Sequence, residues 1–190
     1  MIDNLGRAAL VLIDWQLGMD DPRWGHRNNP DAEANAARLL AVWRDAGLPI
    51  YHVQHLSREP DSVFRPERPG SAIKDMLRPM PGEPVVQKDV NSAFIGTDLE
   101  VQLRSAGIQV VVLTGMQTDH CVSTTARMAG NLGFTTYVVA DATATFDRPG
   151  PEGASYPAEQ VHEINLASLK GEFANIVDTA DLVSAVTIHS

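Results

Sequence analysis

The sequence predicts an α/β protein with a three-layer, Rossmann-like fold, in which helices cover both faces of a mostly parallel sheet of about six strands. Short apolar runs alternate with alanine-rich or amphipathic stretches along the chain. Several of these runs are continuous rather than alternating with polar residues, which is typical of parallel strands buried on both faces. No internal repeat or linker divides the chain, so we expect one domain over residues 1–190.

The first half of the chain opens with a predicted strand over 8–14, whose length and β-branched residues favour a buried position. Residues 31–47 are alanine-rich, carry leucine and tryptophan at helical spacing and end in glycine, so they predict a helix. A second strand is predicted over 48–55. Residues 57–84 are rich in Pro, Arg and Glu and predict an irregular loop with a short helix around 71–77. A loop of this length could be a solvated cover, a lid or an oligomer contact.

The second half of the chain continues the alternation of strands and helices. Thr97 and Glu100 stand at capping-box spacing, and Gly107 follows as a stop, which predicts a helix over 97–107. The most apolar run, 108–115, predicts a strand. The other predicted elements are a strand over 84–89, a helix over 118–132, a strand over 135–141, a helix over 157–171, a strand over 174–179 and one or two helical turns over 180–186.

Composition and charge favour a globular protein that acts on a small molecule. Hydrophobic residues make up 44% of the chain, and no apolar run approaches the roughly 20 residues that span a bilayer. The net charge of −9 and the scattered basic residues argue against a nucleic-acid partner. One cysteine excludes an internal disulfide, and the first residues lack the pattern of a signal peptide, so we expect a cytoplasmic location.

Polar or reactive side chains stand near the ends of the first five predicted strands. In open α/β sheets the site lies beyond the carboxyl ends of the strands. The residues found at those ends are, in chain order, Asp14, His55, Lys88, Cys121 and Asp141. The sequence therefore predicts a site built by several of them.

Cys121, the single cysteine, is the candidate nucleophile. It is expected in the first turn of the helix after the fourth strand. Unpaired amide groups and the helix dipole at such a position lower the pKa of a thiol and can receive an oxyanion. A thiolate beside an oxyanion site can attack a carbonyl carbon. The alternative is a buried cysteine that serves only for packing.

Asp14 and Lys88 are the candidate partners of the thiol, because their strands could flank the fourth strand. A carboxylate can accept the thiol proton and later donate it, and an ammonium keeps that carboxylate ionised. His120 is less suitable, because adjacent helical residues point about 100° apart. Asp14 could instead be only a structural partner, and Lys88 a solvated charge.

With these residues in place, the sequence resembles the isochorismatase-like cysteine hydrolases, which include nicotinamidases, N-carbamoylsarcosine amidohydrolases and streptothricin-hydrolase-like enzymes. The resemblance spans nearly the whole chain. It is carried by "VLIDWQ" with Asp14, "VVQKDVNSAF" with Lys88 and "VVLTGMQTDHCVSTTARMAGNLGF" with Cys121. It implies a Cys–Asp–Lys triad formed by these three residues, a parallel sheet with helices on both faces, and a homo-oligomer, which we expect to be a dimer or tetramer.

The resemblance also implies a cis peptide bond between Met116 and Gln117. In the family this bond directs the amide N–H of Gln117, together with that of Cys121, toward the substrate oxygen. The cysteine itself distinguishes the chain from isochorismatases proper, which cleave a vinyl ether without it. The implied reaction is hydrolysis of a C–N bond in a small amide, cyclic imide or carbamoyl compound, through a thioester at Cys121.

The metal site of nicotinamidases has no counterpart in the sequence, because the segment after the second strand lacks Asp-x-His. His52 and His55 differ by three along a strand, so they point to opposite faces. We therefore expect no metal and no cofactor, with His55 and Glu59 as the weaker alternative for a lone metal ligand.

Five residues near the triad in sequence are candidate substrate contacts, although aromatic side chains are more often part of the core. They are Trp15, Gln16, His55, Phe94 and Gln117. Two other functions remain open. One is a vinyl-ether hydrolase in which Asp14 alone is the acid, and the other is a non-catalytic protein whose thiol responds to oxidation.

Overall fold

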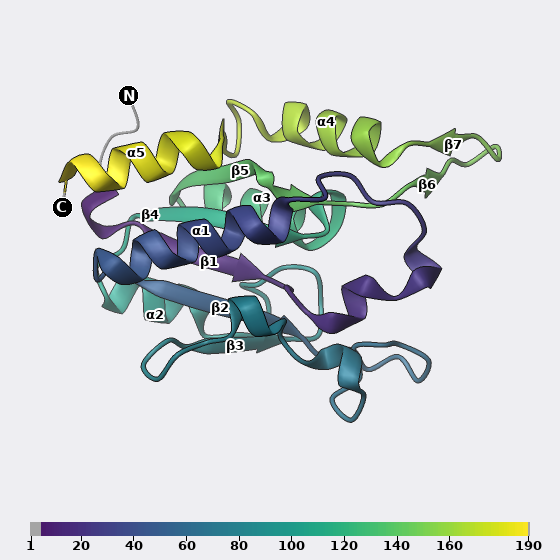
Figure 1. The fold of residues 1–190 in the computed structure, drawn as a ribbon, viewed down its shortest axis with the longest axis horizontal. Helices are drawn as coiled ribbons and strands as arrows, with labels where there is room; N and C mark the ends of the chain where they lie inside the picture. Colours follow the sequence, from purple (N-terminus) through teal and green to yellow (C-terminus); the bar gives the residue numbers. More distant parts are fainter. Residues whose placement is uncertain (1–4, 190) are drawn as a thin grey trace.

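A computed structural model describes residues 5–189 as an α/β fold around one six-stranded sheet in which all paired strands are parallel (Figure 1). The strand order is β3-β2-β1-β4-β5-β8, which confirms the predicted fold class. The strands are β1 (Ala9–Ile13), β2 (Ile50–His55), β3 (Val85–Lys88), β4 (Val110–Met116), β5 (Thr135–Ala144) and β8 (Asn175–Val177).

Helices cover both faces of the sheet, with α1 in front of it and α2 and α3 behind it in Figure 1. The helices are α1 (Ala32–Asp45), α2 (Leu99–Ser105), α3 (Ser123–Asn131), α4 (Ala158–Leu169) and α5 (Thr179–His189). Alternate residues of β1 enter two separate cores. Leu10 and Leu12 pack with α1 and α5, whereas Val11 and Ile13 pack with α2, α3 and α4. A strand buried on both faces must be apolar throughout, which explains the continuous run in the sequence.

The loop over 57–84 is irregular, as predicted, and winds through short 3₁₀ turns. The short helix predicted around 71–77 is instead two such turns, η4 (Pro69–Ser71) and η5 (Asp75–Leu77). Each turn starts with its own cap and ends after three residues. The segment between the two turns is bound to residues 15–17 instead: Leu17 N–H donates to the Ala72 carbonyl and Lys74 N–H to the Trp15 carbonyl, both at 2.9 Å, so the backbone there is not free to form a continuous helix.

The capping box predicted for the second helix does not form. Helix α2 begins at Leu99 after Asp98, which makes no side-chain cap. Thr97 Oγ1 donates instead to the Ala93 carbonyl at 2.6 Å, and Glu100 pairs with Arg104 one turn later at 2.8 Å. Thr97 Oγ1 also accepts from Leu99 N–H at the start of the helix, at 3.4 Å, whereas Glu100 is bound to Arg104, so the reciprocal pair of bonds of a capping box is missing.

The last third of the chain differs from the prediction in three further ways. Strand β5 continues to Ala144, beyond the predicted end, and pairs with the end of β4 after a register shift. A two-stranded hairpin of β6 (Arg148–Pro149) and β7 (Ser155–Tyr156) precedes α4 and was not predicted. Helix α5 is longer than one or two turns, with 11 residues.

The order in which the chain adds strands to the sheet reverses at the pair β1 and β4. Strands β1, β2 and β3 extend to one side, whereas β4, β5 and β8 extend to the other. The two central strands approach closely at their carboxyl ends, where Ile13 is in register with Gly115. A Cβ atom on Gly115 would lie 2.2 Å from the Ile13 carbonyl oxygen, so only glycine fits there. Such a switch point is where open sheets place their sites.

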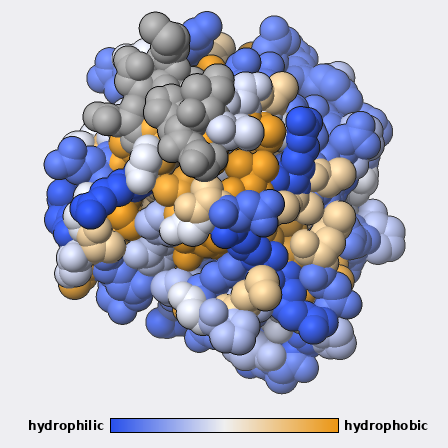
Figure 2. All heavy atoms as spheres, turned by 60° about the vertical axis from the view of Figure 1, so that its left-hand side comes forward, coloured by the Kyte–Doolittle hydropathy of each residue, from blue (hydrophilic) through white to orange (hydrophobic). Residues whose placement is uncertain are grey.

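The surface at the amino ends of the strands carries apolar side chains. Figure 2 shows them near the middle of that face, among hydrophilic residues. Within residues 5–189, none of the helices is both long and apolar enough to cross a bilayer. The homo-oligomer expected from the sequence stays a prediction.

Candidate active site

Asp14 follows β1 directly and lies at the switch point with its side chain fully buried. Its φ angle is 54°, in the left-handed region that Asp tolerates better than most residues. The backbone is fixed there on both sides: Asp14 N–H donates to the Val53 carbonyl at 2.9 Å, and its own carbonyl accepts from Gln16 at 2.8 Å. These two bonds hold the Asp14 backbone out of the extended conformation of β1, and its side chain points toward the site.

Cys121 lies on the connection between β4 and α3, in a π-type turn over Thr118–Val122. The peptide bond between Met116 and Gln117 is cis. The Gln117 carbonyl accepts from His120 N–H at 3.0 Å and from Val122 N–H at 3.2 Å, so one oxygen closes the turn around the cysteine. Cys121 is only 8% exposed and packs with the core behind the sheet.

Lys88 joins the acid and the thiol. Its buried ammonium lies 2.7 Å from Asp14 Oδ2 and 3.3 Å from Cys121 Sγ. The expectation that the strand of Lys88 could flank the fourth strand is wrong, because β3 is the edge strand and β2 and β1 lie between it and β4. The length of the lysine side chain bridges this distance.

His55 supplies a third partner to the same ammonium. It is in register with Lys88 on the neighbouring strand, and its Nδ1 lies 3.2 Å from Lys88 Nζ. Burial, and next the Lys88 charge, lower the pKa of His55, so the imidazole is neutral at pH 7 and accepts through Nδ1. The three protons of the ammonium thus point to a carboxylate, a sulfur and an imidazole.

The pKa of the thiol differs from the expectation. Its place before a helix led us to expect a lowered pKa, but burial, and next the negative charge of Asp14, raise the pKa of Cys121. Lys88 opposes this rise without cancelling it. Cys121 is therefore held as a thiol, and any attack by its sulfur would first require removal of that proton. Asp14 Oδ1, which has no hydrogen-bond partner among the described residues, is the oxygen free to take it.

A metal would compete with the lysine for this position. Among the described residues, the possible ligand atoms that gather are those of Asp14, His55 and Cys121, all within 4.8 Å of one another, and Glu59 is not part of the group. The Lys88 ammonium contacts all three, so it holds the centre that a cation would need. His52 belongs to another cluster, where its Nε2 lies 2.8 Å from Glu83.

The other residues expected at the site lie around the triad in different roles. Trp15 is buried in the opposite core and donates to Thr114 Oγ1 at 3.2 Å. The Gln16 amide is bound to the backbone of His55, accepting at 2.8 Å and donating at 2.9 Å, so it holds that histidine in place. Phe94 is half-buried and stacks on Phe134. The contacts of Trp15 and Phe94 indicate a packing role, and those of Gln16 indicate that it positions His55.

Asp141 and His120 interact with partners other than the triad. Asp141 accepts from Thr179 at the start of α5, with both contacts at 2.8 Å, and has no contact with the triad among those described. His120 Nε2 lies 3.5 Å from Asp119 Oδ2, and its side chain is half exposed. Neither is placed to exchange a proton with Cys121.

Asn91 is a site residue that the sequence analysis missed. Its Oδ1 lies 3.8 Å from Cys121 Sγ, within reach of a weak S–H hydrogen bond. The loop that carries it is tied to α3, since Ala93 N–H donates to Thr125 Oγ1 at 3.1 Å. The only sequence signal was its place three residues after Lys88, which does not show which way a loop residue points.

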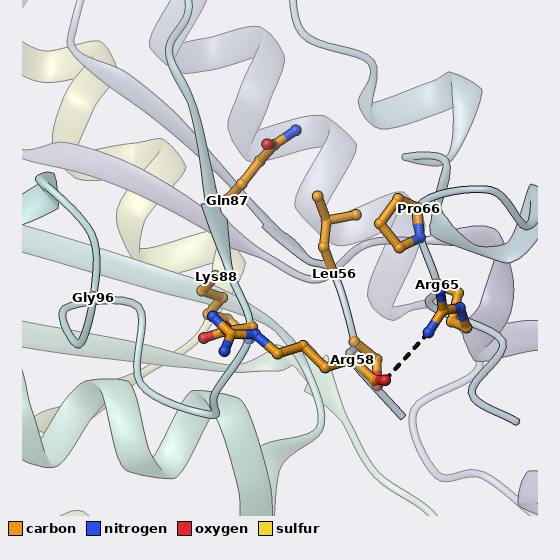
Figure 3. A pocket seen from close by; sticks show the side chains of 9 residues that line it. Leu56, Arg58, Arg65, Pro66, Gln87, Lys88 and Gly96 are labelled. Carbon is orange, nitrogen blue, oxygen red and sulfur yellow. Dashed lines mark hydrogen bonds and ion pairs between the residues drawn. The ribbon is translucent and has the colours of Figure 1, made fainter. Parts of the chain in front are cut away.

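A pocket of about 500 Å³ opens beside the triad at the carboxyl ends of β2 and β3. Figure 3 shows the Arg58 side chain extending toward Lys88 and Arg65 on the opposite side near Pro66, with Arg65 donating to the Arg58 carbonyl at 3.2 Å. Leu56 and Pro66 add apolar surface. Lys88 is among the residues that line this pocket, but its side chain has no exposed surface, and neither Asp14 nor Cys121 is part of the lining.

Comparisons with known proteins agree with this architecture. The Isochorismatase domain family matches residues 8–181. YrdC of Bacillus subtilis, an uncharacterized isochorismatase family protein, is 46% identical over 94% of this chain and 95% of its own length. Nicotinamidase 3 of Arabidopsis thaliana is 28% identical over 90% of this chain and 84% of its own.

A solved structure from Chromobacterium violaceum, also of the isochorismatase family, superimposes with a TM-score of 0.96. It is 44% identical and covers 99% of this chain and 97% of its own. Family match, sequence identity and superposition all extend over nearly the whole chain. The chain belongs to the isochorismatase family of hydrolases.

Proposed function

We propose that the protein is a cysteine hydrolase that cleaves a C–N bond in a small amide, cyclic imide or carbamoyl compound. The observation that carries the proposal is the buried contact of one ammonium, Lys88 Nζ, with both Asp14 Oδ2 and Cys121 Sγ. Three side chains from separate strand ends rarely share a desolvated position without a use, because buried charges are costly. The similarity to Nicotinamidase 3, named for an amide substrate, supports the same class of reaction.

In the acylation step, Cys121 Sγ attacks the carbonyl carbon while Asp14 accepts the thiol proton. The new S–C bond places a negative charge on the carbonyl oxygen, which the amide N–H groups of Gln117 and Cys121 receive. Protonated Asp14 then gives its proton to the leaving nitrogen as the C–N bond breaks. An amide gives a thioester at Cys121 and a free amine or ammonia, and a carbamoyl compound gives the corresponding thiocarbamate. In a cyclic imide the ring opens, and the nitrogen stays on the acyl group as a terminal amide.

In the deacylation step, water attacks the thioester and Asp14 accepts one of its protons. The S–C bond breaks, the acid product leaves, and Asp14 returns the proton to the sulfur. The Lys88 ammonium stabilises each negative charge that forms on Asp14 or Cys121. His55 holds the ammonium in place through Nδ1.

The deciding experiment uses a panel of small amides, cyclic imides and carbamoyl compounds. The readout is release of ammonia or amine for the amides and carbamoyl compounds, and formation of the ring-opened acid for the imides. Cys121→Ala should abolish turnover while leaving the protein folded, because it removes a single sulfur atom and leaves the Asp14–Lys88 pair in place. A hydrolysable substrate should give native protein whose mass is increased by one acyl group after rapid acid quenching, and the Cys121→Ala variant should show no such adduct.

The two rivals predict different results in the same assay. A vinyl-ether hydrolase that uses Asp14 alone as its acid would keep its rate in the Cys121→Ala variant. A redox-responsive protein would form no acyl adduct with any compound, and its thiol would change mass only on oxidation. Either result would overturn the proposed mechanism.

A further inference from the structure

Arg148 makes the densest set of polar contacts near the nucleophile, yet the mechanism above does not use it. Its Nε donates to Asp119 Oδ2 at 2.7 Å, and its Nη2 to Asp119 Oδ1 at 3.2 Å. The same Nη2 also donates to Gln117 Oε1. The two side chains of the ion pair are mostly buried, with 22% of Arg148 and 10% of Asp119 exposed. A two-point pair of this kind fixes orientation as well as charge.

Both partners of Arg148 belong to the segment that holds Cys121. Gln117 stands at its start, and Asp119 lies two residues before the sulfur. Within the turn, the Gln117 carbonyl already accepts hydrogen bonds from the N–H groups of His120 and Val122. Arg148, which lies outside the turn, donates hydrogen bonds to the side chains of both Gln117 and Asp119.

The hairpin that carries Arg148 has its own attachments. The Asp147 N–H donates to the His26 carbonyl at 3.1 Å, and Asp147 Oδ1 accepts from Ala158 N–H at 2.8 Å. Asp119 in turn accepts from Thr145 Oγ1. The two bonds of Asp147 involve neither Arg148 nor the turn, so the hairpin keeps these attachments when the arginine is replaced. The contacts of Arg148 act mainly on the turn.

We propose that Arg148 is a positioning residue that holds the Gln117–Cys121 turn in the shape that receives the oxyanion of the substrate. This inference rests on the proposed function, because it assigns a use to the amide groups of that turn. Arg148 acts through Asp119 and Gln117 and does not itself take part in bond making. A lysine could not replace it fully, because one ammonium cannot make the same two-point contact.

The test separates reactivity of the sulfur from stabilisation of the oxygen. Iodoacetamide alkylates the thiol with loss of iodide and forms no oxyanion. Benzaldehyde adds the thiol across its C=O bond: an S–C bond forms, the thiol proton ends on the oxygen, and no other reactant is required. Its affinity is measured as protection of Cys121 from iodoacetamide.

In the Arg148→Met variant, benzaldehyde affinity should fall about tenfold while the alkylation rate without aldehyde stays within about twofold, because only the oxygen site is disturbed. Arg148→Lys should fall between native and Arg148→Met. Arg127→Met on α3 is the matched control, since Arg127 contacts Ser168 and Phe173 and should leave both readouts unchanged. Asp119→Asn tests the same contact from the other side and should reproduce the aldehyde defect.

The possible failures are distinguishable. Unchanged aldehyde affinity in Arg148→Met, or an equal fall in affinity and alkylation rate, overturns the role of Arg148 alone. If Arg148→Met does not fold, Arg148→Lys and Asp119→Asn decide by the same two readouts. Native protein that benzaldehyde does not protect counts against the carbonyl-attacking cysteine itself, and thus against both proposals.

Discussion

The Lys88 ammonium nitrogen lies 2.7 Å from Asp14 Oδ2, and neither side chain is exposed to solvent. Burial of two charges is tolerated here because each neutralises the other and because the ammonium has two further acceptors, Cys121 and His55. The pair is therefore part of the stability of the fold as well as of the proposed chemistry. Removing one member leaves the other as an uncompensated buried charge.

We expect Lys88→Met to abolish hydrolysis and to lower the free energy of unfolding by about 3–5 kcal/mol, because Asp14 loses its counter-charge. The double variant Lys88→Met, Asp14→Asn should regain much of that stability but no activity. Urea denaturation and turnover on the same preparations measure both effects. A Lys88→Met variant as stable as the native protein would show that the pair does not contribute to folding.

The pH dependence of Cys121 alkylation provides a second prediction. Because burial and Asp14 raise the pKa of the thiol, native protein should react slowly with iodoacetamide at pH 7, and its rate should still be rising above pH 9. Urea-unfolded protein should instead show a midpoint at about 8.5. In Asp14→Asn, the native profile should shift to lower pH, since a negative charge is removed. A native midpoint below 8 would contradict the burial argument.

The raised pKa of Cys121 also predicts how the free energy of unfolding changes at alkaline pH. The folded state holds the thiol proton more tightly than the unfolded state does. The stabilisation is complete below the unfolded pKa, about 8.5, and is lost progressively as the pH rises above it. Cys121→Ala should therefore unfold with a weaker pH dependence between pH 8.5 and 10.5 than the native protein, as measured by urea denaturation.

Gly115→Ala should be severely destabilising, by more than about 3 kcal/mol, because the added Cβ meets the Ile13 carbonyl at 2.2 Å and the backbone φ is 146°. Gly133→Ala is the matched control: its φ is also positive, at 84°, but nothing lies within 4 Å of the added atom. It should cost about 1 kcal/mol. Thermal and urea unfolding compare the two, and equal losses would show that the contact between β1 and β4 is not the cause.

Acid stability should depend on Glu83. Burial raises its pKa, but hydrogen bonds led by that from Arg44 outweigh this effect and bring the pKa to about 2. The resulting stabilisation is complete above the ordinary value of 4.5 and is lost as the pH falls toward 2. Glu83→Gln should therefore cost about 2 kcal/mol at pH 7 and much less at pH 2.

The control for that prediction is Glu67→Gln, which removes a carboxylate that is 59% exposed and paired with Arg65 on the surface. Exposed pairs contribute less than about 1 kcal/mol, so its effect should be small at every pH. The two variants are compared by urea denaturation at several pH values. Equal pH dependence would refute the role assigned to the buried hydrogen bonds of Glu83.

The sequence predicted the edge of the sheet at which the candidate site lies, because strand ends can be read from apolar runs. It placed Asp14, Lys88 and Cys121 at that edge, and the structure brings them into contact. The contacts of Asn91 and Arg148 could not be predicted, since both lie on irregular segments whose direction no periodic pattern encodes.

The pKa of Cys121 shows why a correct position can lead to a wrong property. A helix start favours a charge by about 0.3–1 kcal/mol, which is less than one pKa unit. Burial of a charged group can shift a pKa by several units in the opposite direction. The sequence indicated the turn but not that the sulfur would be only 8% exposed beside a carboxylate, so the smaller effect was the one anticipated.

The pairing of β1 with β4 also bears on how the protein is made. Ile13 and Gly115 are register partners about 100 residues apart, and α1, β2, β3 and α2 all lie between them in the chain. Asp14 cannot meet Cys121 until synthesis has passed both, and long-range contacts of this kind form slowly. During translation the thiol of Cys121 is therefore that of an ordinary cysteine until the two strands pair. In a refolding experiment, recovery of turnover after dilution from urea would report that the central sheet is complete.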